Sequence, residues 1–179
     1  MPGTVFFDVD TQIDFLFPAG ALWVPGAETL LPVIARLNRH ASAHGIPLIS
    51  TMDAHAENDE EFRRFPAHCV AGTLAQRKPE ATLVPGQTIL RKRHVDCFTA
   101  PELPALLGGF AARRYLVYGV VTEICVRHAA LGLLRTGAAV HLIQDATMHL
   151  NPSSRDAFLD EFTASGGQLA STGFACGIL

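Results

Sequence analysis

Residues 116–126 read Leu-Val-Tyr-Gly-Val-Val-Thr-Glu-Ile-Cys-Val, an apolar run followed at once by a short polar turn and a cysteine. The apolar run is typical of a buried strand, and Thr122 is a residue type that caps helices, so this stretch predicts a strand that passes into a helix. Cys125 then falls in the first helical turn, where the helix dipole is expected to lower the pKa of a thiol. A cysteine nucleophile is expected at such a position.

Short apolar runs and helical periods alternate along the rest of the chain. Strands are predicted over residues 4–9, 46–51, 88–92, 114–121, 140–144 and 169–172. Helices are predicted over residues 27–44, 101–107, 123–136 and 154–165, the last with a serine cap. This order predicts a three-layer α/β/α fold with a mainly parallel, Rossmann-like central sheet. We expect a single domain over residues 1–179.

The composition narrows the class of protein. Hydrophobic residues make up 49% of the chain and charged residues 17%, which is typical of a compact globular protein, and the net charge of -3 does not favour nucleic-acid binding. No apolar stretch is long enough to span a bilayer, and the N-terminus lacks the basic region of a signal peptide. The four cysteines are widely spaced without a Cys-x-x-Cys pair. We therefore expect a reduced, cytoplasmic protein with no membrane or nucleic-acid partner.

Polar residues follow four of the predicted strands. They are Asp10, Asp53 with His55, Lys92 and Cys125. Ligands of parallel sheets bind outside the carboxyl ends of the strands, near the point where the strand order reverses. The sequence therefore predicts a functional site at this edge of the sheet.

The segment after the first strand carries three carboxylates, Asp8, Asp10 and Asp14. Each of them alone is explained by turn chemistry, because aspartate favours the starts of loops. Alternation along a strand places Asp8 and Asp10 on the same face. The residue pattern by itself leaves their roles open.

A second group of polar residues suits a divalent metal. Asp53 offers a carboxylate, and His55 and His68 offer imidazole nitrogens. One histidine is near the aspartate in sequence and the other is distant, as in metal sites that keep an open position. With eight histidines in the chain, Asp-x-His spacing alone has little weight. Cys69 follows His68, but neighbours on an extended chain point apart, so we expect a structural role for Cys69. Lys92 either belongs to a solvated basic turn or lies near the thiol and stabilises negative charge there.

Taken together, these segments resemble the isochorismatase-like cysteine hydrolase superfamily, and within it the nicotinamidases, from about Thr4 to Thr172. Residues 10–15 resemble the motif Asp-x-Gln-x-Asp-Phe, and residues 119–126 resemble the strand and turn that carry the nucleophile. Residues 65–73 resemble Trp-Pro-x-His-Cys-Val-x-Gly-Thr, with Phe65 in place of the tryptophan. Asp8 stands where the family usually has an aliphatic residue.

The resemblance implies a role for each candidate residue. Asp10 would be the acid and base, Lys92 the catalytic lysine and Cys125 the nucleophile. A divalent metal, zinc first with iron or manganese as alternatives, would bind Asp53, His55 and His68. A cis peptide bond between residues 120 and 121 would direct the N–H groups of Val121 and Cys125 at an oxyanion, and Phe15 and Phe65 would flank the substrate ring.

The expected activity is hydrolysis of a C–N amide bond, with nicotinamide converted to nicotinate and ammonia through a thioester. Two alternatives remain: an amidohydrolase for an N-carbamoyl compound or another small carboxamide, and a non-catalytic redox sensor that uses Cys125. The partner is expected to be a small-molecule carboxamide, and the protein a homo-oligomer.

Overall fold

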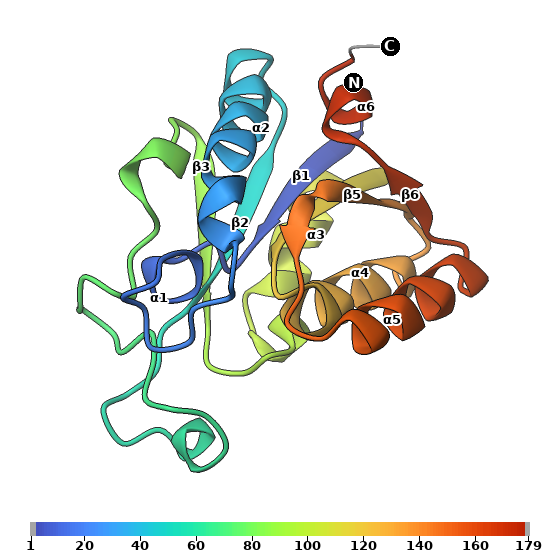
Figure 1. Cartoon of the computed structure of the whole chain (residues 1–179). Helices are drawn as coiled ribbons and strands as arrows, with labels where there is room; N and C mark the ends of the chain where they lie inside the picture. Colours follow the sequence, from blue (N-terminus) through green and yellow to red (C-terminus); the bar gives the residue numbers. More distant parts are fainter. Residues whose placement is uncertain (1–2, 178–179) are drawn as a thin grey trace.

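The computed structural model describes residues 3–177, which fold around one parallel β-sheet. Its strand order is β3-β2-β1-β4-β5-β6 (Figure 1). The strands are β1 (Thr4–Val9), β2 (Leu48–Asp53), β3 (Gln87–Lys92), β4 (Arg114–Val120), β5 (Ala139–Met148) and β6 (Gln168–Ala170). The predicted α/β fold with a parallel central sheet is confirmed.

Helices cover both faces of the sheet (Figure 1). They are α1 (Ile13–Leu16), α2 (Leu31–Ala43), α3 (Leu103–Phe110), α4 (Arg127–Leu134), α5 (Pro152–Ala164) and α6 (Thr172–Ala175). Val5, Phe7 and Val9 pack in one core with residues of α3, α4 and α5, whereas Phe6 packs in a second core with α2. Each fully buried phenylalanine stabilises the fold by roughly 1.5–3 kcal/mol. None of the described helices combines the length and apolar character needed to cross a bilayer.

Several element boundaries differ from the sequence-based prediction: β2 runs from Leu48 to Asp53 rather than over 46–51, β5 extends to Met148 rather than to residue 144, and α4 begins at Arg127 rather than at residue 123. Two further differences follow from helix caps. Helix α5 begins at Pro152 and has no serine cap, because Asn151 Oδ1 accepts the N–H of Ser154 at 2.9 Å. Proline suits the first helical position, where no N–H donor is needed. Strand β6 ends at Ala170, since Ser171 caps α6 by accepting the N–H of Phe174 at 3.3 Å.

The crevice for a ligand lies where β1 separates two halves of the sheet. The chain leaves β1 for β2 and β3 on one side and returns to β4 on the other. Val9 pairs with Gly119, and a Cβ on Gly119 would lie 2.1 Å from the carbonyl oxygen of Val9. Only glycine allows this approach, which brings the residues after β1 beside the cysteine turn after β4.

Candidate active site

Cys125 lies in a π-helical turn, Thr122–Val126, between β4 and α4. The N–H groups of Ile124 and Val126 both donate to the carbonyl oxygen of Val121, at 3.0 and 3.1 Å. Thr122 does not cap this turn, and its buried hydroxyl has no hydrogen-bond partner among residues 3–177. π-Turns inserted at helix starts are frequent at functional sites. The expected cis peptide bond is present between Val120 and Val121.

Asp10 faces the cysteine turn because the backbone changes direction after β1. Its φ of 48° lies in the left-handed region. Thr51 holds this conformation: the N–H of Asp10 donates to Thr51 Oγ1 at 3.1 Å, and that hydroxyl donates to Asp10 Oδ1 at 2.6 Å. Asp8 instead accepts a hydrogen bond from Asn38 on α2. The expectation that Asp8 and Asp10 share a face is wrong, because the strand ends at Val9.

Lys92 joins the residues of the site through one buried ammonium. Its Nζ lies 2.8 Å from Asp10 Oδ2, 2.5 Å from Asp53 Oδ1 and 3.9 Å from Cys125 Sγ, and it donates to the carbonyl oxygen of His94 at 3.0 Å. The acidic and thiol groups of Asp10, Asp53 and Cys125 all lie within 4.8 Å of one another. Lys92 is therefore not part of a solvated turn.

The electrostatics of this cluster favour a protonated thiol at rest. Burial and the carboxylates of Asp10 and Asp53 raise the pKa of Cys125 well above its usual value, although Lys92 opposes them. Burial also raises the pKa of Asp10 against the effect of Lys92. Burial acts to lower the pKa of Lys92, but the two carboxylates outweigh it and raise that pKa. The expected lowering of the thiol pKa by the helix is thus overridden, and Cys125 needs a base.

Asp53, His55 and His68 offer three ligand atoms within 4.8 Å of one another. His55 is fully buried, yet neither ring nitrogen makes a hydrogen bond within residues 3–177. Its Nε2 lies 3.9 Å from Asp53 Oδ2, and its Nδ1 lies 3.4 Å from Asp59 Oδ2. His68 Nδ1 bonds the carbonyl oxygen of Pro66 at 2.8 Å, which favours a free Nε2 lone pair.

These contacts fit a divalent metal. A buried imidazole without hydrogen bonds is costly unless another ligand takes its lone pair. Asp53 directs Oδ1 to Lys92 and Oδ2 toward His55, so one oxygen remains for a metal. Asp59 lies on the far side of the His55 ring, where a carboxylate would orient the imidazole of a ligating histidine. Burial acts to raise the pKa of Asp53, but Lys92 and His55 outweigh it and lower that pKa, which keeps the carboxylate charged.

Three residues that hold the site in place were not recognised from the sequence. Gln12 Nε2 donates to the carbonyl oxygen of Asp53 at 2.8 Å, and Gln12 Oε1 accepts the N–H of Asp53 at 2.7 Å. Gln76 Nε2 donates to the same carbonyl at 3.2 Å. Asp14 Oδ2 accepts the N–H of Cys69 at 2.6 Å, which fixes the segment that carries His68. The only sequence signal was the place of Gln12 and Asp14 in the 10–15 motif.

A cavity of about 220 Å³ opens onto the cysteine. Asp53, His68 and Cys125 contribute its polar part, together with Glu61. The rest of the wall is apolar and comprises Phe15, Ala21, Leu22, Trp23, Phe65, Val95, Val121, Ile124 and Leu150. Phe15 and Phe65 thus lie where the sequence placed them, whereas Trp23, Leu22 and Leu150 were not anticipated. No lysine or arginine of the described chain lines this cavity.

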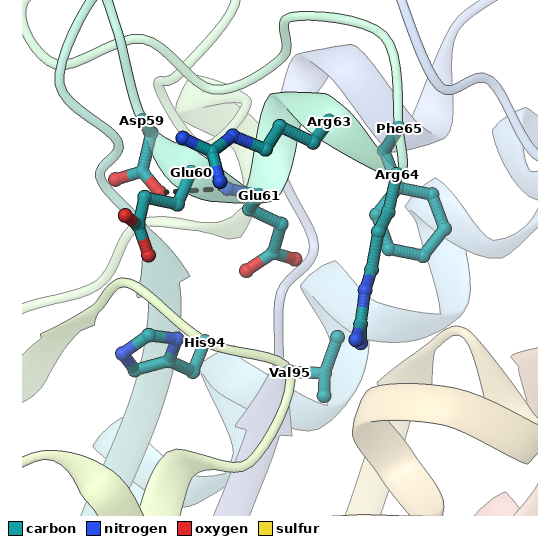
Figure 2. Close-up of a pocket in the computed structure, with 8 residues that line it drawn as sticks. All are labelled: Asp59, Glu60, Glu61, Arg63, Arg64, Phe65, His94 and Val95. Carbon is teal, nitrogen blue, oxygen red and sulfur yellow. Dashed lines mark hydrogen bonds between the residues drawn. The ribbon is translucent and has the colours of Figure 1, made fainter.

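A second cavity of about 400 Å³ adjoins the first. The two share Glu61, Phe65 and Val95. Figure 2 shows the Glu61 carboxylate directed into the second cavity, between His94 and the guanidinium of Arg64. Glu61 is therefore the charged side chain at the junction of the two cavities.

Comparison with known proteins places this geometry in a family. The isochorismatase domain matches residues 4–173. Nicotinamidase of Escherichia coli (strain K12) is 26% identical over 208 residues, covering 94% of this chain and 95% of that protein. N-carbamoylsarcosine amidase of an Arthrobacter species is 22% identical over 124 residues, covering 63% and 47%.

A solved structure extends this similarity to three dimensions. Pyrazinamidase of Pyrococcus horikoshii in complex with zinc is 30% identical, with a TM-score of 0.89 over 95% of this chain and 99% of that one. The resemblance seen in the sequence is confirmed. Because the family match spans nearly all of the described residues and the fold agrees, the chain belongs to the isochorismatase family of hydrolases.

Proposed function

We propose that this hydrolase cleaves a small heteroaromatic carboxamide, nicotinamide in the first place, to the carboxylate and ammonia through a thioester on Cys125. One observation carries the proposal. The buried Lys92 ammonium contacts Asp10, Asp53 and Cys125 at once, so a base, a candidate metal ligand and a thiol share one cation. The similarity to a nicotinamidase and a pyrazinamidase supports the same substrate class.

Acylation begins with a protonated thiol, because the pKa of Cys125 is raised. Asp10 accepts the proton while the sulfur attacks the carboxamide carbon, and Lys92 keeps the changing charges paired. The carbonyl electron pair moves onto oxygen, where the N–H groups of Val121 and Cys125 would stabilise it. When the C–N bond breaks, Asp10 returns the proton to nitrogen and ammonia leaves.

Deacylation repeats the same proton transfers with water. Asp10 accepts a proton from the water as its oxygen attacks the thioester carbon. The C–S bond then breaks, Cys125 recovers its proton from Asp10, and the acid is released. A carboxyl group with a raised pKa suits both directions of transfer, because it binds a proton more readily than a solvated aspartate does.

The metal-binding residues would orient the ring. Asp53, His55 and His68 would hold a divalent ion, zinc with iron or manganese as alternatives, which would supply a Lewis acid for a substrate ring nitrogen. Phe15 and Phe65 contribute aromatic wall beside this point. A cavity of about 220 Å³ has room for a single substituted ring.

Hydrolysis of an N-carbamoyl amino acid is the second candidate, because the Arthrobacter relative is an amidase of that kind. The charge of the cavity favours the first candidate. Glu61 carries a carboxylate at the edge of this cavity, and no arginine or lysine of the described residues lines it, so the carboxylate of such a substrate would meet a like charge without a basic side chain to bind it. A redox sensor is disfavoured, since oxidation follows thiolate character and the pKa of Cys125 is raised.

The test is an ammonia-release assay with zinc-loaded protein on nicotinamide, pyrazinamide, benzamide and N-carbamoylsarcosine, with metal content measured in parallel. We expect turnover of the two heteroaromatic amides with a lower KM than that of benzamide, and no turnover with Cys125→Ala of unchanged melting temperature. Turnover confined to N-carbamoylsarcosine would establish the second candidate, and ammonia release by Cys125→Ala would refute the cysteine mechanism.

A further inference from the structure

We propose that the buried Asp8–Lys78 pair positions the catalytic groups by holding the turn that follows β1. The roles that it supports, Asp10 as base and Asp53 as metal ligand, rest on the proposed function. The pair is separate from the reacting atoms. Asp8 lies one residue before the end of β1, and Lys78 lies in the long connection between β2 and β3.

The pair is buried and its bonds converge on one hydroxyl. Asp8 is fully buried and Lys78 is 4% exposed, with Lys78 Nζ 3.1 Å from Asp8 Oδ2. Thr11 Oγ1 donates to Asp8 Oδ1 at 2.8 Å and accepts from Lys78 Nζ at 2.6 Å. Asp8 Oδ2 also accepts from Ser50 Oγ at 3.0 Å and from Asn38 Nδ2 at 3.2 Å. Thr11 is the residue directly after Asp10, so the pair anchors the left-handed turn at Asp10.

The same pair fastens the segment before Lys78 against the motif after Asp10. The N–H groups of Ile13 and Asp14 donate to the carbonyl oxygens of Arg77 and Ala75, at 2.9 and 3.0 Å. Gln12 Nε2 donates to the carbonyl oxygen of Gln76 at 2.7 Å. Both segments of this contact also bond the same residue, because the side chains of Gln12 and Gln76 each form hydrogen bonds with the backbone of Asp53.

Stability alone does not account for such a pair. A buried ion pair seldom stabilises a fold more than apolar residues of similar volume would, because desolvation offsets the attraction. The hydrogen bonds of such a pair do depend on orientation. Here they hold the backbone at Asp10 and at Asp53, the two aspartates that contact Lys92. We infer that Thr11 transmits the position of the pair to Asp10, and that the segment before Lys78 transmits it to Asp53.

The test removes one hydroxyl rather than a charge, because a stranded charge endangers folding. Thr11→Val removes the hydroxyl between the pair and the turn, and Thr11→Ser keeps it. Ser50→Ala is the matched control, since Ser50 is equally buried and donates to the same Asp8 carboxylate, but its hydroxyl bonds Asp8 and Gln87 rather than a residue of the turn after β1. We expect Thr11→Val to lower kcat about 10-fold with KM within about twofold, the size seen when groups behind a site are removed. Thr11→Ser and Ser50→Ala should retain kcat.

A second readout needs no substrate. The rate at which iodoacetamide alkylates Cys125, followed by peptide mass spectrometry at a temperature below all melting transitions, depends on the groups beside the thiol. We expect this rate to change at least about threefold in Thr11→Val only. Equal alkylation rates in the four proteins, or equal losses in Thr11→Val and Ser50→Ala, would overturn the inference. If only Thr11→Val changes the alkylation rate but the protein does not hydrolyse nicotinamide, the proposed substrate would be refuted and the positioning role of the Asp8–Lys78 pair would stand.

Discussion

Two buried aspartate–lysine pairs lie two residues apart at the end of the same strand, and they are bonded differently. Asp10 and Lys92 approach to 2.8 Å, and Asp8 and Lys78 to 3.1 Å. The Asp8 carboxylate is saturated, because Thr11, Asn38 and Ser50 donate to it besides the ion pair. Asp10 Oδ2 lies near Lys92 without the geometry of a hydrogen bond.

The difference separates a reactive carboxylate from a positioning one. A carboxylate that keeps an uncommitted lone pair beside a thiol can accept a proton, whereas a saturated one must first break a hydrogen bond. Asp10 has that thiol within 4.8 Å, in Cys125. Charge and burial are nearly the same in both pairs, so the neighbours decide the function.

The largest expected effect breaks the reactive pair. Asp10→Asn keeps the shape of the side chain but removes the base, so we expect kcat to fall about 10²–10⁴-fold, the range that a general acid–base group contributes. The melting temperature should fall less than in a variant that lacks Lys92, because Asp53 still pairs with the Lys92 ammonium and the amide oxygen of the new side chain would still accept the Thr51 hydroxyl. Steady-state ammonia release and thermal unfolding measure both, and a kcat above a tenth of wild type would contradict the assignment of the base.

The second prediction compares the two lysines. Lys78→Met strands the buried Asp8 carboxylate and Lys92→Met strands those of Asp10 and Asp53, so each should reduce the free energy of unfolding by at least about 3–5 kcal/mol in urea titrations. Activity should separate them. We expect Lys92→Met to lose at least about 100-fold in kcat and Lys78→Met about 10-fold, and equal losses would erase the distinction between the pairs.

A third prediction concerns the metal ligands beside the reactive pair. His55→Ala should weaken zinc binding by more than the roughly 10–100-fold that loss of a group behind a ligand costs, measured by titration of the apoprotein, because it removes one of three ligands. The KM for nicotinamide should rise with it. Benzamide, which lacks the ring nitrogen, is the control substrate, and an equal rise in its KM would show that His55 does not act through the ring.

The smallest expected effect tests the charge of the cavity. Glu61→Gln should raise kcat/KM for a carboxamide that bears a ring carboxylate by about two- to fivefold, since partly exposed charges interact weakly. Nicotinamide turnover should stay within about twofold. Glu60→Gln is the matched control, because Glu60 lines only the second cavity. The same gain in both variants would point to net charge rather than to a contact in the cavity.

Sequence reasoning reached the fold because its signals are local. Apolar runs alternating with helical periods indicate strands and helices, and parallel strands bring residues at their carboxyl ends to one edge. Asp10, Asp53, Lys92 and Cys125 meet there in the structure, as expected. The boundary errors at α5 and β6 are also local, since Asn151 and Ser171 each bond a backbone N–H that a nearby residue could equally have capped.

The sequence by itself determined the class of fold and the set of polar residues at one edge of the sheet, because hydrophobic periodicity and motif order depend only on neighbours along the chain. The residue pattern left the choice between Asp8 and Asp10 open and the resemblance to the family pointed to Asp10, but only the tertiary structure shows why Asp10 faces Cys125 and whether that thiol is charged. The first depends on the left-handed turn at Asp10, which Thr51 holds from another strand. The second depends on burial and on carboxylates that come from distant segments, and these outweigh the effect of the helix on the thiol pKa.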